Sequence, residues 1–104
     1  MRIYVAGHKG LVGSALVRAI DAHPGHTWIG ASRSELNLFD KEATLEFLKS
    51  NSPDAVIIAA AKVGGIMANA TYPVEFLTEN LRIELNLLEA CHEAGIERVL
   101  FLGS

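Results

Sequence analysis

The stretch IYVAGHKGLVG, residues 3–13, joins a short apolar run to a turn that contains three regularly spaced glycines. The run Ile3–Ala6 is rich in aromatic and β-branched residues and stops at Gly7, which is typical of a buried strand. From Leu11 to about Ala22 the apolar residues recur at helical spacing, until a Pro-Gly pair ends the pattern. This part of the sequence therefore predicts a strand, a glycine turn and a helix.

The alternation of strand and helix continues along the chain. We expect further strands at Thr27–Ala31, Asp54–Ala60 and Arg98–Leu102, helices at about Lys41–Ser50 and Pro73–Ala94, and loops at Ser32–Phe39 and Ala61–Tyr72. Asp40 is expected to cap the second helix at its N-terminus, and Gly95 to cap the third at its C-terminus. The strand Asp54–Ala60 is apolar on both faces, as in a parallel sheet covered by helices on both sides.

This βαβαβαβ pattern predicts an α/β fold: a Rossmann-type, doubly wound parallel sheet with right-handed crossovers and the strand order 3-2-1-4. These strands make only part of such a sheet, and the last of them would be an unpaired edge. We therefore expect residues 1–104 to be the N-terminal part of a larger domain.

Composition argues against several classes of protein. Of the 104 residues, 50% are hydrophobic and the net charge is only −3, which disfavours a disordered chain and disfavours nucleic acid or an anionic membrane as a partner. A single cysteine excludes a disulfide framework, and no apolar run approaches the roughly 18–20 residues that a membrane-spanning helix needs. Because no signal-peptide pattern is visible, the expected location is the cytoplasm.

The spacing G-x-x-G-x-x-G, placed between the first strand and the first helix, predicts a dinucleotide-binding site. Gly7 permits a tight turn, Gly10 lets the backbone approach a pyrophosphate, and Gly13 lets the helix pack closely on the strand. The free N–H groups and the positive dipole end of the helix would face the phosphates. The alternative interpretation is a glycine-rich turn without a ligand.

The end of the second strand indicates which dinucleotide is bound. A site for NAD typically carries an Asp or Glu there, which binds the ribose 2′-hydroxyl. This sequence has Ala31-Ser32-Arg33-Ser34 instead, and a guanidinium suits a 2′-phosphate. We therefore expect NADP(H), with Lys9 as a second positive charge; the alternative for both side chains is a solvent-exposed cation with no ligand.

Several segments carry a resemblance to a known family: VAGHKGLVGS at 5–14, SELNL at 34–38, AAAKVGGI at 59–66 and FLGS at 101–104. Together they resemble the GDP-L-fucose synthases, a family of extended short-chain dehydrogenase/reductases, over essentially the whole chain. AAAKVGGI, with NATYP at 69–73 after it, is the most specific part. The resemblance implies an enzyme that epimerises GDP-4-keto-6-deoxy-D-mannose at C3 and C5 and then uses NADPH to reduce its C4 ketone, giving GDP-L-fucose.

The resemblance also implies roles for single residues. The pyrophosphate loop would consist of Gly7, His8, Lys9, Gly10, Leu11, Val12 and Gly13, with His8 acting mainly through its backbone. Lys9 and Arg33 would contact the 2′-phosphate, Asn37 and Leu38 the adenine, and Ala60, Ala61 and Lys62 the cofactor ribose. Leu102 and Gly103 complete the expected cofactor contacts, and Ser104 matches the catalytic serine. For Lys62 a surface lysine is the alternative.

One part of the family pattern is not found in these residues. In the family, a Tyr-x-x-x-Lys pair, an epimerisation Cys and His, and a nucleotide-sugar domain follow the catalytic serine, so here they would lie after Ser104. A serine hydroxyl without those partners cannot run the reaction, and we expect this chain alone to be inactive. Two other functions stay open: another NAD(P)-dependent sugar epimerase or dehydratase of the extended family, and a non-catalytic NADP(H)-binding module.

The long helix carries two apolar stripes at helical spacing. One consists of Leu77, Leu81, Leu85 and Leu88, and the other of Phe76, Ile83, Leu87 and Ala90. One stripe can face the sheet and the other a second helix, which predicts a homodimer through the helix Val74–Ala94. Asn80 lies within the apolar arc and is expected either to bond a loop backbone or to lie near the cofactor.

The remaining candidate residues predict no further chemistry. His23 and His26 are too few to hold a metal ion, so no metal site is expected. Cys91 is expected to be a small helix residue that packs against the core.

Overall fold

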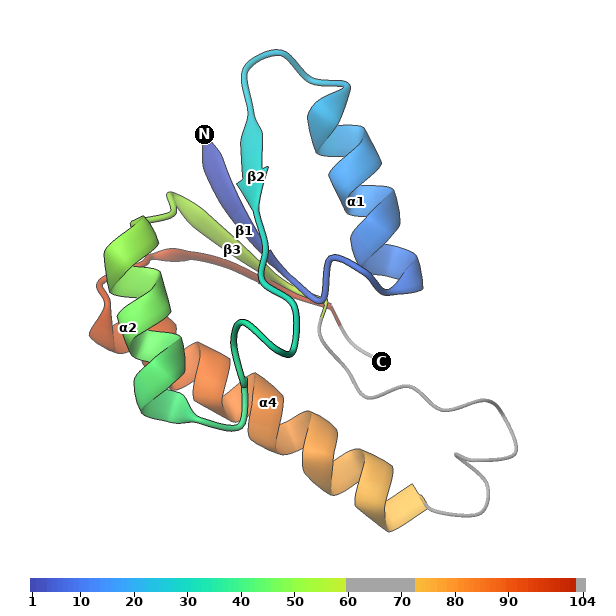
Figure 1. Cartoon of the computed structure of the whole chain (residues 1–104), viewed down its shortest axis with the longest axis vertical. Helices are drawn as coiled ribbons and strands as arrows, with labels where there is room; N and C mark the ends of the chain where they lie inside the picture. Colours follow the sequence, from blue (N-terminus) through green and yellow to red (C-terminus); the bar gives the residue numbers. More distant parts are fainter. Residues whose placement is uncertain (60–72, 103–104) are drawn as a thin grey trace.

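The structure, a computed structural model, describes residues 1–59 and 73–102, and of residues 73–77 only the backbone. Strands β1 (Arg2–Ala6), β2 (Thr27–Ile29), β3 (Ala55–Ile58) and β4 (Arg98–Phe101) alternate with helices α1 (Leu11–Asp21), α2 (Lys41–Asn51) and α4 (Pro73–Glu93). Every expected strand and helix is present, with bounds that differ from the sequence prediction by no more than two residues. The α/β class and the parallel Rossmann-type sheet are confirmed (Figure 1).

The order of the strands in the sheet is β2-β1-β3-β4, and all neighbouring pairs are parallel. The predicted order 3-2-1-4 is wrong, because β3 lies beside β1 and not beyond β2; β4 does lie at an edge, as expected. The physical reason lies in β2, which has only three residues, none of them fully buried, and so suits an edge position. In β3 alternate residues are fully buried, which suits the interior of the sheet.

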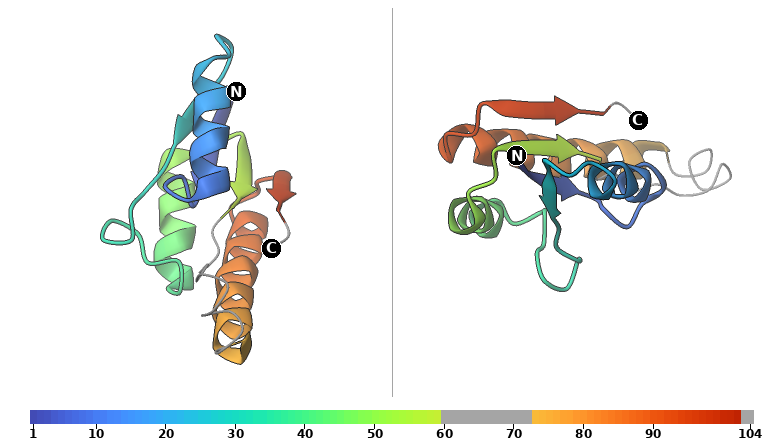
Figure 2. Two further views of the ribbon diagram at one scale, coloured as in Figure 1. Left: turned by 90° about the vertical axis from the view of Figure 1, so that its right-hand side faces the viewer. Right: turned by 90° about the horizontal axis from the view of Figure 1, so that it is seen from above.

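The chain reverses its direction across the sheet after β2, and this places helices on both faces. Helix α1 connects β1 to β2 on one face, whereas the connection through α2 passes back over β1 to β3 on the other face (Figures 1 and 2). Right-handed crossovers require this change of face when the direction reverses. The topological switch point therefore lies between the neighbouring strands β1 and β3.

Two apolar clusters hold these layers together. The larger cluster joins β1 and β3 to α2 and α4, and its buried members are Tyr4, Ala6, Leu36, Leu48, Val56, Ile58, Ile83, Leu87, Ala90 and Cys91. The smaller cluster joins α1 to the other face of the sheet through Ile3, Val5 and Ile20. The three buried residues Ile83, Leu87 and Ala90 belong to one predicted stripe of α4, so this stripe is the one that faces the sheet.

Local capping explains where α2 and α4 begin and end. The Asp40 carboxylate accepts a hydrogen bond from the Ala43 N–H at 3.1 Å, which confirms the predicted N-cap of α2. Ser52 adopts a left-handed conformation, with a φ of 46°, and ends α2. Gly95, with a φ of 77°, ends α4 as predicted, and the following Ile96 N–H donates to the Cys91 carbonyl.

Candidate functional site

The carboxyl ends of β1 and β3 lie side by side at the switch point. Ala6 pairs with Ile58, and the Ala59 N–H donates to the Ala6 carbonyl at 2.9 Å. After Ala6 the chain leaves the sheet toward α1 on one face, while α2 and α4 cover the other face (Figure 2). Ligands of open α/β sheets bind in the crevice at such a point. The candidate site therefore starts from the glycine turn that follows β1.

The glycine turn leads directly from β1 into α1. Gly7 has a φ of 89°, a conformation that residues with a side chain rarely adopt, and its carbonyl accepts the Gly10 N–H at 3.1 Å. Gly13 packs against the same carbonyl, since a Cβ built at Gly13 would lie only 1.9 Å from the Gly7 oxygen. The tight turn predicted at Gly7 is therefore present, and the close packing at Gly13 is made against the turn itself.

The first turn of α1 presents backbone N–H groups to solvent. Gly10 is the N-cap residue, no side chain of the described residues caps the helix, and the first turn of α1 contains no acidic residue. Leu11 and Val12 are 89% and 53% exposed, so this end of the helix is uncovered. Free N–H groups and a positive dipole end together make an anion-binding site. A Cβ at Gly10 would meet only the Gly7 oxygen, at an ordinary 3.4 Å, so packing alone does not require glycine there.

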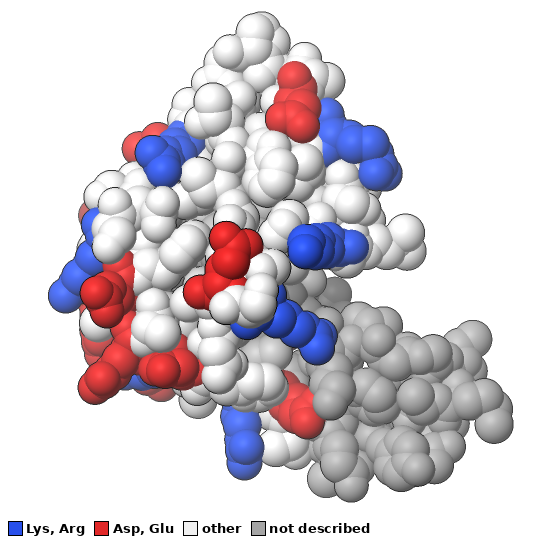
Figure 3. All heavy atoms as spheres, viewed as in Figure 1, with Lys and Arg blue, Asp and Glu red and all other residues white. Residues whose placement is uncertain are grey.

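Both predicted cations near this end of the sheet are exposed. Lys9 lies in the glycine turn and Arg33 in the loop after β2, and neither forms an ion pair with another residue of the described ranges. Figure 3 shows exposed Lys and Arg side chains on this face of the molecule. Exposed cations next to an uncapped helix N-terminus favour a ligand that carries several negative charges.

Glu35 is a charged group near the end of β2 that the sequence prediction did not consider. Its carboxylate accepts the Ser32 N–H at 2.9 Å, because the chain folds back here and the Ser32 carbonyl accepts the N–H groups of Glu35 and Leu36. The hydrogen bonds from Ser32 lower the pKa of the Glu35 carboxyl, and electrostatic interaction with Lys9 and His8 lowers this pKa further. The loop after β2 therefore does contain an acidic side chain, although the Glu35 carboxylate already accepts a hydrogen bond from the Ser32 N–H.

The side chain of His8 ties the glycine turn to β2. Its ring lies 5.4 Å from the ring of Trp28, centroid to centroid, and the Trp28 indole N–H donates to Asp21 at 3.0 Å. Gly30 leaves room for this ring, because a Cβ at Gly30 would lie 2.7 Å from His8 Nδ1. The position of the turn is thus set by an aromatic contact as well as by its glycines.

The loop before α2 carries the residues predicted to contact adenine. Asn37 is exposed, and its side-chain oxygen accepts the Phe39 N–H at 3.0 Å, whereas Leu38 packs half-buried against the larger cluster. Asn86 of α4 reaches this loop, and its Nδ2 donates to the carbonyls of Leu38 and Phe39 at 3.1 and 3.0 Å. The sequence analysis did not identify Asn86 as a candidate site residue. No local pattern could have linked it to a loop 47 and 48 positions earlier.

Other predicted site residues follow β3 and β4. The Leu102 N–H donates to the Ile58 carbonyl at 3.2 Å, which places Leu102 beside the carboxyl end of β3. Ala60, Ala61, Lys62, Gly103 and Ser104 lie outside the described residues. The structure thus gathers the glycine turn, the end of β2, the loop before α2 and Leu102 at one end of the sheet (Figure 1).

The other candidate groups lie in the core or far from the crevice. Cys91 is 1% exposed and burial raises the pKa of its thiol to about 11, which confirms the prediction of a core residue. The rings of His23 and His26 stack 4.4 Å apart, and within the part of the chain that the structure describes no group of three or more His, Cys, Asp or Glu could hold a metal ion. Among the described helices none is both long enough and apolar enough to cross a membrane.

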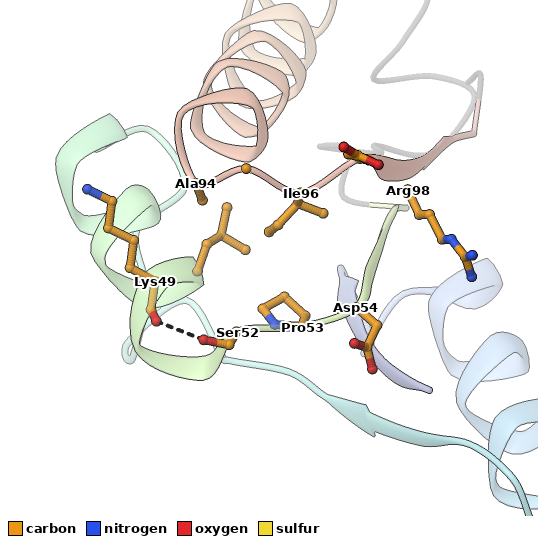
Figure 4. A pocket seen from close by; sticks show the side chains of 10 residues that line it. Lys49, Ser52, Pro53, Asp54, Ala94, Ile96 and Arg98 are labelled. Carbon is orange, nitrogen blue, oxygen red and sulfur yellow. Dashed lines mark hydrogen bonds between the residues drawn. The ribbon is translucent and has the colours of Figure 1, made fainter.

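A surface hollow lies at the opposite end of the sheet from the glycine turn (Figure 4). Lys49, Ser52 and Asp54 line it on the α2 side, and Ile96 and Arg98 line it on the β4 side. The amino ends of β3 and β4 border this hollow, whereas ligands of this fold class bind at the carboxyl ends. The hollow is therefore not part of the crevice at the switch point.

Comparison with known proteins identifies relatives that share this fold. The chain is 48% identical to a GDP-L-fucose synthase of Sinorhizobium fredii and 45% identical to one of Escherichia coli, and in both cases the match covers 99% of this chain and 32% of the relative. The chain thus spans less than half the length of these curated relatives. It also superimposes with a TM-score of 0.87 on MlghC, a GDP-mannoheptose C4 reductase from Campylobacter jejuni with NADP bound, at 31% identity over 98% of this chain and 32% of that one. Residues 3–104 match the sequence model of the NAD dependent epimerase/dehydratase family, and the chain belongs to that family.

Proposed function

We propose that this chain is the NADP(H)-binding portion of a nucleotide-sugar epimerase/reductase that converts GDP-4-keto-6-deoxy-D-mannose to GDP-L-fucose. The observation that carries the proposal is the uncapped N-terminus of α1 beside the switch point between β1 and β3. The names of the relatives support GDP-L-fucose as the product, and the family supports a coenzyme of the NAD type. The proposed location is the cytoplasm.

The described residues fit such a coenzyme. The N–H groups at the start of α1 would hold the pyrophosphate, and the exposed side chains of Leu11 and Val12 would border it. Asn37 and Leu38 would hold the adenine. The complete proposed set is Gly7, His8, Lys9, Gly10, Leu11, Val12, Gly13, Arg33, Asn37, Leu38, Ala60, Ala61, Lys62, Leu102 and Gly103.

We propose that NADP(H) is preferred over NAD(H). Arg33 and Lys9 are exposed and carry no ion pair within the described residues, so both can meet a 2′-phosphate. Glu35, the nearby acid, already accepts the Ser32 N–H and is thus engaged in the loop. The related MlghC structure was solved with NADP bound, which supports the same choice.

The task of these residues in the proposed reaction is to bind and orient the coenzyme. When bound, the coenzyme supplies the hydride that reduces the C4 ketone. Ser104 would hydrogen-bond the substrate oxygen, and residues 1–104 would form the N-terminal part of the NADP-binding domain. Because the acid that protonates this oxygen is not among these residues, we expect no turnover by residues 1–104 alone.

We also propose a homodimer through the helix Val74–Ala94. Leu81, Leu85 and Leu88 are 53%, 56% and 41% exposed and form the stripe of α4 that does not belong to the larger cluster. A row of exposed leucines is costly in water and is covered when two such helices pack together. A monomer found by light scattering of the full-length protein would contradict this proposal.

The coenzyme proposal is tested by titrating the full-length protein with NADPH and NADH and measuring both dissociation constants. Arg33→Ala should weaken NADPH binding by about 1.5–3 kcal/mol, roughly 10- to 150-fold, because a charge-assisted contact is lost, and should leave NADH binding unchanged. Lys49→Ala is the matched control, since Lys49 lies at the opposite end of the sheet. A wild-type protein that binds neither coenzyme refutes the proposal, and an unchanged NADPH/NADH ratio in Arg33→Ala shows that Arg33 is not the selector.

A further inference from the structure

Asn86 connects α4 to the loop before α2, two segments that are far apart in the sequence. We propose that Asn86 is a positioning residue for the adenosine end of the coenzyme, because it holds the loop Asn37–Asp40 in the conformation that binds adenine. The inference rests on the proposed function and adds to it a residue that does not touch the coenzyme itself.

The geometry of this contact is specific. A single nitrogen, Asn86 Nδ2, donates to two consecutive carbonyls, that of Leu38 at 3.1 Å and that of Phe39 at 3.0 Å. A primary amide has two N–H donors, so both are used. Leu87, the next residue of α4, is fully buried in the larger cluster, which fixes the helix at this point. The amide is therefore presented to the loop from a rigid element.

Among the described residues, one backbone donor of this loop has no hydrogen-bond acceptor. The Phe39 N–H donates to the Asn37 side chain, and the Asp40 N–H donates to the Asn37 carbonyl, both at 3.0 Å. The Leu38 N–H forms no hydrogen bond with any of the described residues, and in this proposal it is the donor to a ring nitrogen of adenine. With its carbonyls turned to α4, the loop keeps this donor in one orientation.

A second contact between the same helices provides a matched comparison. Lys41, at the start of α2, forms ion pairs with Glu89 at 2.8 Å and with Glu93 at 3.0 Å. These two carboxylates follow Asn86 at helical spacing, on the same side of α4. The ion pairs join the same helices as Asn86 does, but they are partly exposed and leave the loop carbonyls untouched.

The expected effect follows from the population of loop conformations. Without Asn86 both carbonyls can turn to water, and the loop gains conformations in which the Leu38 N–H points elsewhere. If the competent conformation falls to roughly one molecule in ten, the apparent affinity falls about tenfold. The adenine is common to NADPH and NADH, so both affinities should fall by the same factor.

The experiment compares Asn86→Asp with wild type in the full-length protein, by titration with NADPH and NADH. Aspartate has the same shape but, when ionised, no donor, so at pH 8 we expect a loss of about tenfold for both coenzymes with an unchanged NADPH/NADH ratio. At lower pH the introduced carboxyl takes up a proton and donates to one carbonyl, so the variant should recover affinity relative to wild type at the same pH. A recovery of affinity over a pH range in which the urea midpoint of the variant stays constant separates a positioning role from a purely structural one.

Further variants keep the test decisive. Lys41→Met should retain both affinities, and Asn86→Ala, which removes the donors without adding a charge, should lose affinity for both coenzymes; this variant gives the answer if Asn86→Asp does not fold. A wild-type affinity in Asn86→Asp at pH 8, or an equal loss in Lys41→Met, overturns the inference while the coenzyme proposal stands. Failure of the wild-type protein to bind either coenzyme refutes the proposed function itself.

Discussion

Replacing Gly13 by alanine separates the packing role of a glycine from a ligand-binding role. A Cβ at this position would lie 1.9 Å from the Gly7 oxygen, 2.7 Å from the Gly7 carbonyl carbon and 3.0 Å from the His8 Cα. All of these atoms belong to the backbone, so no flexible side chain can move aside. To reach 3.0 Å the Gly7 oxygen must move by at least 1.1 Å, the difference between 3.0 and 1.9 Å.

The magnitude follows from three contributions. Overpacking in a rigid region costs about 1–3 kcal/mol, and loss of the hydrogen bond between the Gly10 N–H and the Gly7 carbonyl costs about 1 kcal/mol more. The higher helix propensity of alanine stabilises the folded state by about 1 kcal/mol and so opposes these losses. We therefore expect Gly13→Ala to lower the free energy of unfolding by about 2 kcal/mol, or Tm by roughly 4–8 °C for a domain of 150–250 residues.

Gly10→Ala is the matched control in the same turn. Gly10 has a φ of −72° and a ψ of 174°, which alanine adopts readily, and the nearest contact of its Cβ would be 3.4 Å. The poorer N-cap propensity of alanine and the smaller entropy of its unfolded chain each amount to roughly 0.5–1 kcal/mol and oppose each other. The free energy of unfolding of Gly10→Ala should stay close to that of wild type. Its NADPH affinity should fall because the added methyl group occupies the approach to the N-terminus of α1.

The assay is urea unfolding of the full-length variants, combined with titration by NADPH. Gly13→Ala should be less stable than wild type, and Gly10→Ala should be stable but deficient in binding. A Gly13→Ala variant as stable as wild type would refute the packing argument. Full NADPH affinity in Gly10→Ala would refute the ligand role assigned to that glycine.

Two further predictions concern other parts of the fold. Asp40→Ala should lower the free energy of unfolding by about 1 kcal/mol because the N-cap of α2 is lost. Asp40→Asn keeps an acceptor oxygen and should retain most of this stability. Equal urea midpoints for Asp40→Ala and wild type would contradict the prediction. The Cys91 thiol, with its pKa raised to about 11 by burial, should be alkylated at pH 8 far more slowly in the native protein than in urea, as measured by mass spectrometry. Burial disfavours the thiolate, so the free energy of unfolding should fall as the pH rises from the pKa of the unfolded thiol toward 11. Replacement of Cys91 by Ala should remove this part of the decrease in stability.

Local sequence determined the elements and the glycine turn. Strand composition, capping residues and apolar spacing depend on near neighbours, so the caps at Asp40 and Gly95 and the two apolar stripes of α4 could be predicted, although not which stripe is buried. The φ of 89° at Gly7 likewise follows from the need for a tight turn between a strand and a helix. The class of the fold and the start of the candidate site were therefore readable from the residues alone.

Only the tertiary structure decided which strands are neighbours and which distant groups support the site. A strand that is apolar on both faces fits any interior position, so the sequence pattern could not distinguish the order 3-2-1-4 from β2-β1-β3-β4. The contact of Asn86 with Leu38 and Phe39 depends on how α4 packs beside α2, and the contact of His8 with Trp28 depends on how the glycine turn lies beside β2. These contacts join residues from separate elements, and their geometry exists only once the layers have packed.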